Sequence, residues 1–495
     1  MSSTITSTGT LIDEAVFGGK IFIDGAWVAG EGGTIASVEP ATGGTLATVG
    51  IAGPGDVTRA AEGAARAQKE WAATPHPVRA AVLRRAGQLW EQHAEEIGGW
   101  NTREVGAIPP LAGFALHVTA AECYEASALP SAPLGSILSS EEPRLSLAQQ
   151  IPVGVVGVIS PFNVPLILGI RAVAPALALG NAVILKPDPR TVITGGVSMV
   201  RIFEEAGLPA GLLQLVPGGA DVGEAMVADP RVRVIAFTGS TRAGRIVGEL
   251  AGRHLKRAHL ELGGNSAFII REDADVAQAV NLATWGSFLH QGQICMTVGR
   301  HIVHESIFES YVTALAEKAD SMHVGDPAAG PVHLGPLIDE VQRDRVHTLV
   351  QDAVAQGAEL RAGGTYEDLF YRPTVLANTP KDAAAYCEEV FGPVASVVSY
   401  STDEEAVALA SDTDYGLSLG IVTRDVLGGL AMAQRIPTGI VHINDQTVND
   451  EANAPFGGVS ASGTGSRHGG AQASIDAFTE TRWITMRREP GQYPL

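Results

Sequence analysis

The chain has 495 residues, of which 45% are hydrophobic and 18% charged, and its formal net charge is −20 at pH 7. This length exceeds what one hydrophobic core normally organises, so we expect two or three domains. The strong negative charge disfavours nucleic-acid and anionic membrane partners, because such a chain has little to neutralise phosphates. Three cysteines, an odd number in a long chain, form no disulfide framework and favour a reducing, cytoplasmic setting.

The N-terminal segment has no basic start and no apolar run of the length found in signal peptides. Residues 56–100 carry helical periodicity with charged faces, and residues 134–150 have the pattern of a polar hairpin. The most apolar stretch, residues 151–187, is interrupted by several prolines, by Arg171 and by Asn181. No uninterrupted span of about 20 apolar residues therefore remains to cross a membrane.

After residue 152 the pattern becomes strands alternating with helices, which is typical of βαβ units and a parallel sheet. This region is expected to be doubly wound α/β, with any ligand beyond the carboxyl ends of the strands. The expected strands are 153–160, 181–187, 212–218, 233–240 and 259–264, and the expected helices are 170–180, 194–206, 223–229 and 241–252.

A second alternating region runs from about residue 264 to 465, and we place a domain boundary at the Gly263-Gly264 pair. The chain ends in a β-prone stretch at 477–495, and an exposed strand of this kind is usually covered, often by another subunit. The expected strands of this second region are 266–270, 299–305, 419–424 and 439–444, and the expected helices lie around 276–290, 306–321, 339–356 and 403–411.

A phosphate-binding motif is only partly visible. No GxGxxG follows a strand, and the nearest forms, PGGADVG (217–223) and SGTGSRHGG (462–470), are weak. AFTGSTRAG (236–244) is better, because a β-branched strand runs straight into a helix whose free backbone N–H groups can bind an anion. An ordinary N-cap at Ser240 or Thr241 explains the same residues equally well.

Two residues at expected strand ends carry polar chemistry. Lys186 in LKPDPR can reach a ribose or phosphate, although surface lysines are common at such positions. Asn163 in SPFNVP lies between two prolines, so its backbone is stiff and its amide can donate to a developing oxyanion. An isolated asparagine is more often an Asx-turn residue, and that alternative stays open.

Three further segments contain candidate acids or a pocket rim. Glu261 in HLELGGNS has apolar and glycine neighbours, which favour a raised pKa and general-base chemistry unless the side chain points to solvent from an edge strand. The pair Glu388-Glu389 in CEEVFGPV is either a sugar-diol acceptor or a solvated pair of charges. The glycine-rich loop 453–465 contains one aromatic residue, Phe456, and fits a flexible surface or a pocket rim.

Cys295 in QGQICMTVGR is the candidate nucleophile. A reactive cysteine needs a partner base or an electropositive environment, and no Cys-His pairing is evident, although His290 lies five residues upstream. Judged alone, Cys295 is more simply a packed, inert thiol.

Together these segments resemble the aldehyde dehydrogenase superfamily, through SPFNVP, LKPDPR, AFTGST, LELGGN, GQICM, EEVFGP and APFGGVSASGTG in that order. The resemblance extends from about residue 20 to about 485 and is strongest to benzaldehyde- and vanillin-type bacterial enzymes. It implies an aldehyde dehydrogenase-like α/β fold with a Rossmann-type doubly wound cofactor domain (18–133 and 151–263), an α/β catalytic domain (264–464) and a β oligomerisation arm (134–150 and 479–495). It also implies a homodimer or homotetramer.

The resemblance implies roles for individual residues. Cys295 would attack the aldehyde, Asn163 and the Cys295 backbone N–H would stabilise the oxyanion, and Glu261 would activate water. The implied cofactor-binding residues are Ser160, Pro161, Phe162, Lys186, Pro187, Gly219, Thr238, Gly239, Ser240, Leu262, Gly263, Glu389 and Phe391. The candidate substrate pocket consists of Ile167, Arg171, Trp285, Ile294, Met296 and Phe456, and no metal site is expected. Arg171 would either meet a polar ring substituent or form a structural ion pair.

The implied cofactor is NAD, with NADP tolerated, because Pro189 stands where many NAD-preferring relatives carry a glutamate. The presence of Glu261 favours hydrolysis to a free acid over transfer to coenzyme A. The expected activity is therefore NAD(P)-dependent oxidation of an aromatic aldehyde. The alternatives are an aliphatic-aldehyde or semialdehyde dehydrogenase, a cofactor-independent thiol esterase, and a non-enzymatic protein that keeps the fold.

Overall fold

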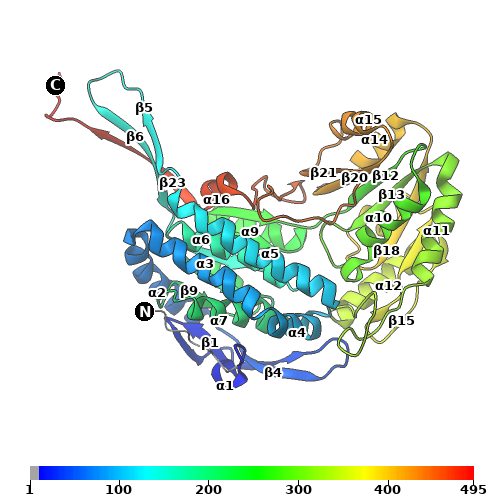
Figure 1. The fold of residues 1–495 in the computed structure, drawn as a ribbon, viewed down its shortest axis with the longest axis horizontal. Helices are drawn as coiled ribbons and strands as arrows, with labels where there is room; N and C mark the ends of the chain where they lie inside the picture. The colour runs from blue at the N-terminus through cyan, green and yellow to red at the C-terminus, as the bar shows by residue number, and fades with distance from the viewer. Residues whose placement is uncertain (1–9, 495) are drawn as a thin grey trace.

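The computed structural model describes residues 10–494. Residues 1–9 of the N-terminal segment, where we expect no signal peptide, and residue 495 at the end of the expected arm lie outside the described residues. The chain forms two seven-stranded sheets, each covered by helices, and a three-stranded sheet that projects from the body (Figure 1).

The first sheet is parallel through its centre, and two N-terminal strands add to it antiparallel. Its central strands are buried runs of β-branched and other apolar residues, as expected for a sheet covered on both faces. In spatial order the strands are β11 (Arg257–Glu261), β10 (Val232–Thr238), β7 (Val155–Ile159), β8 (Ala182–Lys186), β9 (Leu213–Leu215), β1 (Lys20–Ile23) and β2 (Ala26–Ala29).

The strand order reverses between β7 and β10. From β7 the chain moves outward to β8 and β9, then crosses back to form β10 and β11 on the other side. Such a reversal opens a crevice beyond the carboxyl ends of the two diverging strands, where doubly wound proteins bind ligands. The expected α/β architecture of this half is confirmed.

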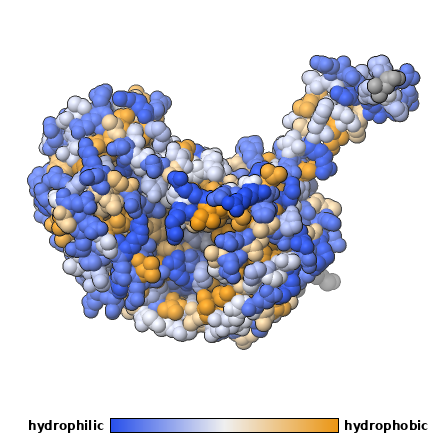
Figure 2. Space-filling view, turned by 180° about the vertical axis from the view of Figure 1, so that it is seen from behind, coloured by the Kyte–Doolittle hydropathy of each residue, from blue (hydrophilic) through white to orange (hydrophobic). Residues whose placement is uncertain are grey.

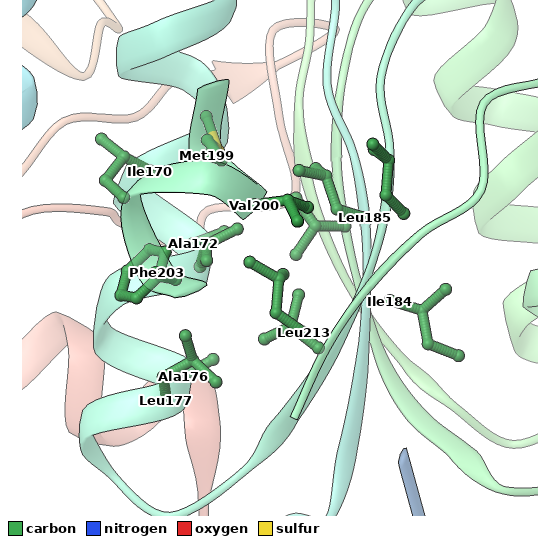
Figure 3. Packing of buried hydrophobic residues seen from close by; sticks show 14 of the residues in the cluster. Ile170, Ala172, Ala176, Leu177, Ile184, Leu185, Met199, Val200, Phe203 and Leu213 are labelled. Carbon is green, nitrogen blue, oxygen red and sulfur yellow. The ribbon is translucent and has the colours of Figure 1, made fainter. Parts of the chain in front are cut away.

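Helices bury the faces of this sheet. Helix α6 is buried along its whole length, and Figure 3 shows its Ile170, Ala172 and Ala176 with Met199 and Phe203 of α7 against the strands β8 and β9. The helices of this half are α1 (Glu14–Phe17), α2 (Pro54–Ala73), α3 (His76–Gln92), α4 (Ala94–Val105), α5 (Pro109–Ala128), α6 (Pro165–Ala178), α7 (Ser198–Glu205), α8 (Ala220–Ala228) and α9 (Thr241–Arg253).

The second sheet is parallel except for one edge strand, β14, which pairs antiparallel with β17. In spatial order it consists of β14 (Glu359–Ala362), β17 (Thr374–Ala377), β18 (Val394–Tyr400), β13 (Val298–His304), β12 (Ser266–Ile270), β20 (Ser418–Val422) and β21 (Ile440–Ile443). Its helices are α10 (Val276–Phe288), α11 (Phe308–Asp320), α12 (Glu340–Ala355), α13 (Ala384–Cys387), α14 (Asp403–Ser411) and α15 (Val426–Ala433). The expected boundary at 263/264 falls between the last strand of the first sheet and the first strand of the second.

The third sheet joins β5 (Gly135–Leu138), β6 (Leu145–Pro152) and the C-terminal β23 (Thr479–Met486), with α16 (Ala471–Phe478) leading into it. It stands clear of the body in Figures 1 and 2. The hairpin was expected to be polar, yet its Leu134 is 64% exposed and its Ile137 is 78% exposed, and Trp483 of the neighbouring β23 is also exposed. The arm therefore offers apolar side chains on its surface.

The short strands β3 (Thr34–Val38), β4 (Thr45–Gly50), β15 (Tyr366–Glu367), β16 (Phe370–Tyr371), β19 (Tyr415–Gly416) and β22 (Val459–Ser460) form three two-stranded pairs. Among residues 10–494 no helix is long and apolar enough to cross a membrane.

Two expectations for individual helices need correction. The helix expected at 276–290 ends at Phe288, because His290 and Gln291 adopt left-handed φ values of 54° and 56°. The 20-residue helix α5 was not expected at all. It packs against both α3 and α6, so apolar residues surround it and no single apolar stripe marks it in the sequence.

A buried carboxylate ties the helices to an N-terminal strand. Glu104 of α4 accepts hydrogen bonds from Ser37 Oγ at 2.8 Å, Ile193 N at 3.0 Å and Thr194 N at 2.6 Å. Replacing Glu104→Ala should leave three buried donors without an acceptor and cost about 2–4 kcal/mol of unfolding free energy. Thermal unfolding measures the loss, with the exposed Glu95→Ala on the same helix as control. Equal melting temperatures for the two variants would contradict this role.

Candidate active site

Cys295 lies on a constrained loop between α10 and β13. Two glutamines attach this loop to neighbouring segments. Gln291 Nε2 donates to the carbonyls of Gly106 at 3.1 Å and Pro336 at 2.7 Å, and Gln293 Oε1 accepts from Ile338 N at 3.1 Å. The left-handed turn at residues 290–292 is thus held by buried amide hydrogen bonds, and the position of the thiol is set by packing rather than by local sequence preference.

Cys295 opens onto two cavities. One, of about 240 Å³, is lined mainly by apolar side chains of α5, α6, α10 and the 446–456 segment. The other, of about 410 Å³, lies beyond the carboxyl ends of β7, β8 and β10, at the reversal of the first sheet. Cys295, Asn163 and Leu168 line both cavities. A group bound in one cavity can therefore meet a group bound in the other at the thiol.

Asn163 is held against the nucleophile loop from both sides. Its side-chain Nδ2 donates to the Gln293 carbonyl at 2.8 Å, and its own carbonyl bonds with His290 Nε2 at 2.7 Å. Burial lowers the pKa of His290 to about 4, so the imidazole is neutral and Nε2 carries the donated proton. An amide nitrogen has two hydrogens, so Asn163 keeps a second N–H for an oxyanion beside the thiol.

Glu261 is the last residue of β11 and is only 2% exposed, which rules out the solvent-facing alternative. Its backbone forms an isolated bridge to Gly463, so the 457–463 loop covers this edge of the sheet. Burial raises the pKa of the carboxyl to about 8, and the charges of Arg171 and Arg467 oppose that rise. A carboxyl with this pKa can take up and release a proton near neutral pH.

The Gly263-Gly264 pair explains why the two halves meet here. A Cβ on Gly264 would lie 2.1 Å from the Cys295 carbonyl oxygen, and one on Gly263 would lie 2.5 Å from Glu389 Oε2. The backbone of this pair is therefore approached closely by the Cys295 loop on one side and by the Glu389 side chain on the other.

The Cys295 thiol is protonated at rest. Burial raises its pKa to about 12, and the charges of Glu389 and Glu261 add to that rise. A thiol is a poor nucleophile until it loses its proton, so this cysteine depends on a nearby base. His290 is a weak candidate for this base, because burial lowers its pKa to about 4 and its Nε2 proton is already donated to the Asn163 carbonyl.

The larger cavity gathers most of the expected cofactor residues. Eleven of them line it: Ser160, Pro161, Phe162, Lys186, Thr238, Gly239, Ser240, Leu262, Gly263, Glu389 and Phe391. The expectation is not met for two residues. Pro187 packs on Gly196 of the following helix, and Gly219 is the N-cap of α8; neither lines the cavity.

This cavity has the donor and acceptor set of a nucleotide site. Ser160 Oγ is buried and has no hydrogen-bond partner within residues 10–494. Lys186 is 8% exposed, and burial lowers the pKa of its ammonium group. Ser240 caps α9 by accepting from Ala243 N at 3.3 Å, so the N-cap alternative holds, and the same helix N-terminus lines the cavity. These groups fit a dinucleotide with phosphates near α9.

Glu388 and Glu389 have different surroundings. Glu389 lines the cavity and accepts from Gly264 N at 3.0 Å, while burial raises the pKa of its carboxyl to about 7. Glu388 lies outside, with a side chain 57% exposed, and pairs with Arg345 at 3.2 Å. Only the second acid of the motif is therefore available to a ligand.

Four polar residues of the cavity were not expected: Asp188, Arg190, Gln342 and Arg345. Arg190 lies 4.1 Å over the Phe162 ring and donates to Asp188 at 2.9 Å and Asp339 at 2.6 Å. Asp188 and Arg190 follow Lys186 in the chain, so their position after the strand was a usable signal. Gln342 and Arg345 lie on α12 of the other half, and nothing local in the sequence indicates them.

All six candidate substrate residues, Ile167, Arg171, Trp285, Ile294, Met296 and Phe456, line the smaller cavity. The sequence reasoning missed its walls from α5, formed by Pro110, Leu111 and Phe114, because that helix was not expected. It also missed the segment 446–450. In the part of the chain that the structure describes, no cluster of three or more His, Cys, Asp or Glu side chains has the arrangement of a metal site.

Comparison with known proteins agrees with this geometry. Vanillin dehydrogenase of an Amycolatopsis species is 62% identical over 485 residues, covering 98% of this chain and 100% of that protein. Benzaldehyde dehydrogenase [NAD(+)] of Pseudomonas putida is 48% identical, covering 97% and 99%. A crystal structure of salicylaldehyde dehydrogenase from Pseudomonas putida G7 complexed with salicylaldehyde superposes with a TM-score of 0.93 at 35% identity, covering 96% and 99%. A crystal structure of betaine aldehyde dehydrogenase from Staphylococcus aureus in complex with NAD+ gives 0.93 at 29% identity, covering 97% and 96%.

Residues 27–484 match the aldehyde dehydrogenase family, which is nearly the whole described chain. The family match, the similarity to these relatives and the similarity of the fold lead to the same conclusion: the chain belongs to the aldehyde dehydrogenase family.

Proposed function

We propose that the protein oxidises an aromatic aldehyde, benzaldehyde or a ring-substituted relative such as vanillin, to its carboxylic acid with NAD. The observation that carries this proposal is the Cys295 thiol shared by a small apolar cavity and a dinucleotide-type cavity. The small cavity matches a single substituted ring, and the names of the relatives, vanillin, benzaldehyde and salicylaldehyde dehydrogenases, support the same substrate class.

The first chemical step is addition of the Cys295 sulfur to the aldehyde carbonyl carbon, which forms a thiohemiacetal. The sulfur attacks as a thiolate, so the thiol, whose pKa is raised by burial, first gives its proton to a water molecule. As the carbonyl oxygen becomes negative, the free Asn163 N–H and the Cys295 backbone N–H donate to it. Both donors are in place before substrate binds, because Asn163 is fixed by Gln293 and His290.

NAD, when bound, supplies the acceptor for the hydride that leaves the substrate carbon. In our proposal Glu389 would hold the nicotinamide ribose, and Lys186 and the N-terminus of α9 at Ser240 would hold the adenosine end and pyrophosphate. The carboxylate of Asp188 is paired with Arg190, so it repels a 2′-phosphate less than an unpaired acid would. We therefore propose NAD as the preferred cofactor and NADP as an accepted one.

Hydrolysis completes the reaction. The ionised Glu261 carboxylate takes a proton from water while the water oxygen attacks the thioester carbon. The carbon–sulfur bond then breaks, the carboxylic acid leaves, and Cys295 is again free. The raised pKa of Glu261 suits this role, because the group can accept a proton and lose it again close to neutral pH.

Two alternatives have less support. An aliphatic-aldehyde or semialdehyde dehydrogenase uses the same chemistry, but the small, mainly apolar cavity and the aromatic-aldehyde relatives favour a ring. A cofactor-independent thiol esterase would not use the larger, dinucleotide-type cavity.

We further propose that the β5–β6–β23 arm, with its exposed apolar residues, joins subunits into a homodimer or homotetramer. We also propose that the enzyme works in the cytoplasm with its three thiols free.

Substrate and cofactor choice are tested together with purified protein. Benzaldehyde, vanillin, a long aliphatic aldehyde and succinic semialdehyde are each offered with NAD and with NADP, and the reduced cofactor is followed by absorbance. We expect the highest kcat/KM for an aromatic aldehyde with NAD. Cys295→Ala should abolish turnover, whereas Cys387→Ala, whose exposed sulfur donates to the Lys381 carbonyl, should retain it. A preference for the semialdehyde would overturn the aromatic assignment.

The pKa of Glu261 predicts the pH dependence. Below about pH 8 the raised pKa keeps this carboxyl mostly protonated and unable to accept a proton, so kcat should rise with pH and level off above that value. Glu261→Gln should lower kcat by roughly 10²–10⁴-fold and let an acyl group accumulate on Cys295, detectable by mass spectrometry of the quenched enzyme. The exposed Glu249→Gln on α9 is the control. A variant at 261 with normal turnover would show that another group activates water.

A further inference from the structure

A buried positive charge lies in the wall of the small cavity. Arg171 projects from α6, is 3% exposed and lies 4.4 Å over the ring of Phe456, another residue of the same wall. Most other side chains that line this cavity are apolar. A guanidinium at such a site needs polar partners, because burying a charge without them is costly.

The hydrogen-bond partners of Arg171 satisfy only part of its guanidinium group. Its Nη2 donates to Asp450, and Glu122 lies 3.9 Å from its Nε. Burial raises the pKa of Glu122 to about 8, so this acid is mostly neutral at pH 7 and adds little compensating charge. Nε and Nη1 have no hydrogen-bond partner anywhere in residues 10–494. Buried charged donors are nearly always satisfied in folded proteins, so unpaired ones beside a ligand cavity point to a ligand atom.

Asp450 supplies an acceptor beside these donors. It lies in the segment after β21, lines the same cavity, and binds Arg171 through Oδ2. Its backbone N–H is held by the side chain of Asn449 at 2.9 Å. Gln446 is another polar residue of the wall, and its side-chain amide Nε2 donates a hydrogen bond to the Val448 carbonyl at 2.8 Å. Arg171 and Asp450 are thus the charged donor and acceptor that remain for a bound substrate.

We propose that Arg171 and Asp450 form a subsite for a hydroxyl group on the ring of the aldehyde. A phenolic hydroxyl both accepts and donates a hydrogen bond, so its oxygen can accept from Arg171 while its hydrogen is donated to Asp450. A methoxy group fills similar space but has no hydrogen to donate, and an unsubstituted ring offers neither function. This inference rests on the proposed function and narrows its substrate class to hydroxybenzaldehydes.

The subsite acts on specificity rather than on the chemical step. A site with buried polar groups rejects a substrate that leaves them unpaired much more strongly than an apolar pocket rejects a missing methyl group. Phe456 lies beneath the guanidinium and holds its plane in the cavity wall. The pair Arg171–Asp450 is therefore a specificity determinant, while Cys295, Asn163 and Glu261 serve any aldehyde that enters.

The test compares each hydroxybenzaldehyde isomer (2-, 3- and 4-) with its methoxy counterpart, below the pH at which the phenol ionises. We expect kcat/KM for at least one hydroxy isomer to exceed that of its methoxy partner by about tenfold or more. Smaller ratios for all three pairs overturn the proposal. If no aromatic aldehyde is oxidised, the proposed function itself fails, which is a different outcome from oxidation without discrimination.

Variants assign the discrimination to the two residues. Arg171→Met and Asp450→Asn should each lower the hydroxy-to-methoxy ratio by about fivefold or more, and taking a ratio within one variant cancels a general loss of active enzyme. Arg231→Met breaks a more exposed arginine–aspartate ion pair, with Asp229, outside both cavities and should keep the wild-type ratio. Unchanged ratios in both pocket variants overturn the assignment.

A binding measurement tests the proposal even if the two pocket variants fail to fold. Calorimetry on Cys295→Ala, which cannot form the covalent adduct, should show the preferred hydroxy isomer binding at least about tenfold more tightly than its methoxy partner. Equal affinities for the two ligands would overturn the proposal without any turnover being required.

Discussion

The site depends on one close backbone approach, that of Gly264 to the carbonyl of Cys295. A Cβ at Gly264 would come within 2.1 Å of that oxygen, so only glycine lets the strand leaving the first sheet pass under the nucleophile loop. A Cβ at the neighbouring Gly263 would lie 2.5 Å from Glu389 Oε2. Glu389 and the Cys295 thiol both line the larger cavity, and Glu261 at the end of β11 lies close enough for its charge to raise the pKa of the thiol.

Burial shapes the acid–base properties of this meeting point. Burial raises the pKa of Cys295, of Glu261 and of Glu389. At neutral pH the thiol is therefore protonated, and the two carboxyl groups are close to their pKa values. A resting thiol with a pKa of about 12 is protected from adventitious oxidation and alkylation.

Local periodicity in the sequence predicted the parallel-sheet architecture and most strands and helices of both halves. The thirteen cofactor residues were implied by the family resemblance, and eleven of them line the larger cavity. The sequence could not show what depends on tertiary packing. Helix α5 has no apolar stripe, since it is covered on several sides, and so the cavity wall that it forms was missed. Gln342 and Arg345 reach the cofactor cavity only because α12 of the second half lies over it. The left-handed turn at His290 and Gln291 ended a helix that periodicity alone extends further.

Arg171 shows how the two kinds of information combine. In the sequence it was an anomaly, a charge within an apolar helix, and both a structural ion pair and a substrate contact were open. In the structure the ion pair with Asp450 exists, yet it uses only part of the guanidinium. A purely structural pair would be more stable with all donors satisfied, and a well-packed apolar residue would often do as well. Keeping an incompletely paired charge in a cavity wall lowers stability, and that cost is understandable if a substrate completes the hydrogen bonds. The same reasoning applies to the Ser160 hydroxyl in the larger cavity, which has no hydrogen-bond partner among the described residues. In each cavity, an unpaired buried polar atom is a position where a ligand can form the missing hydrogen bond.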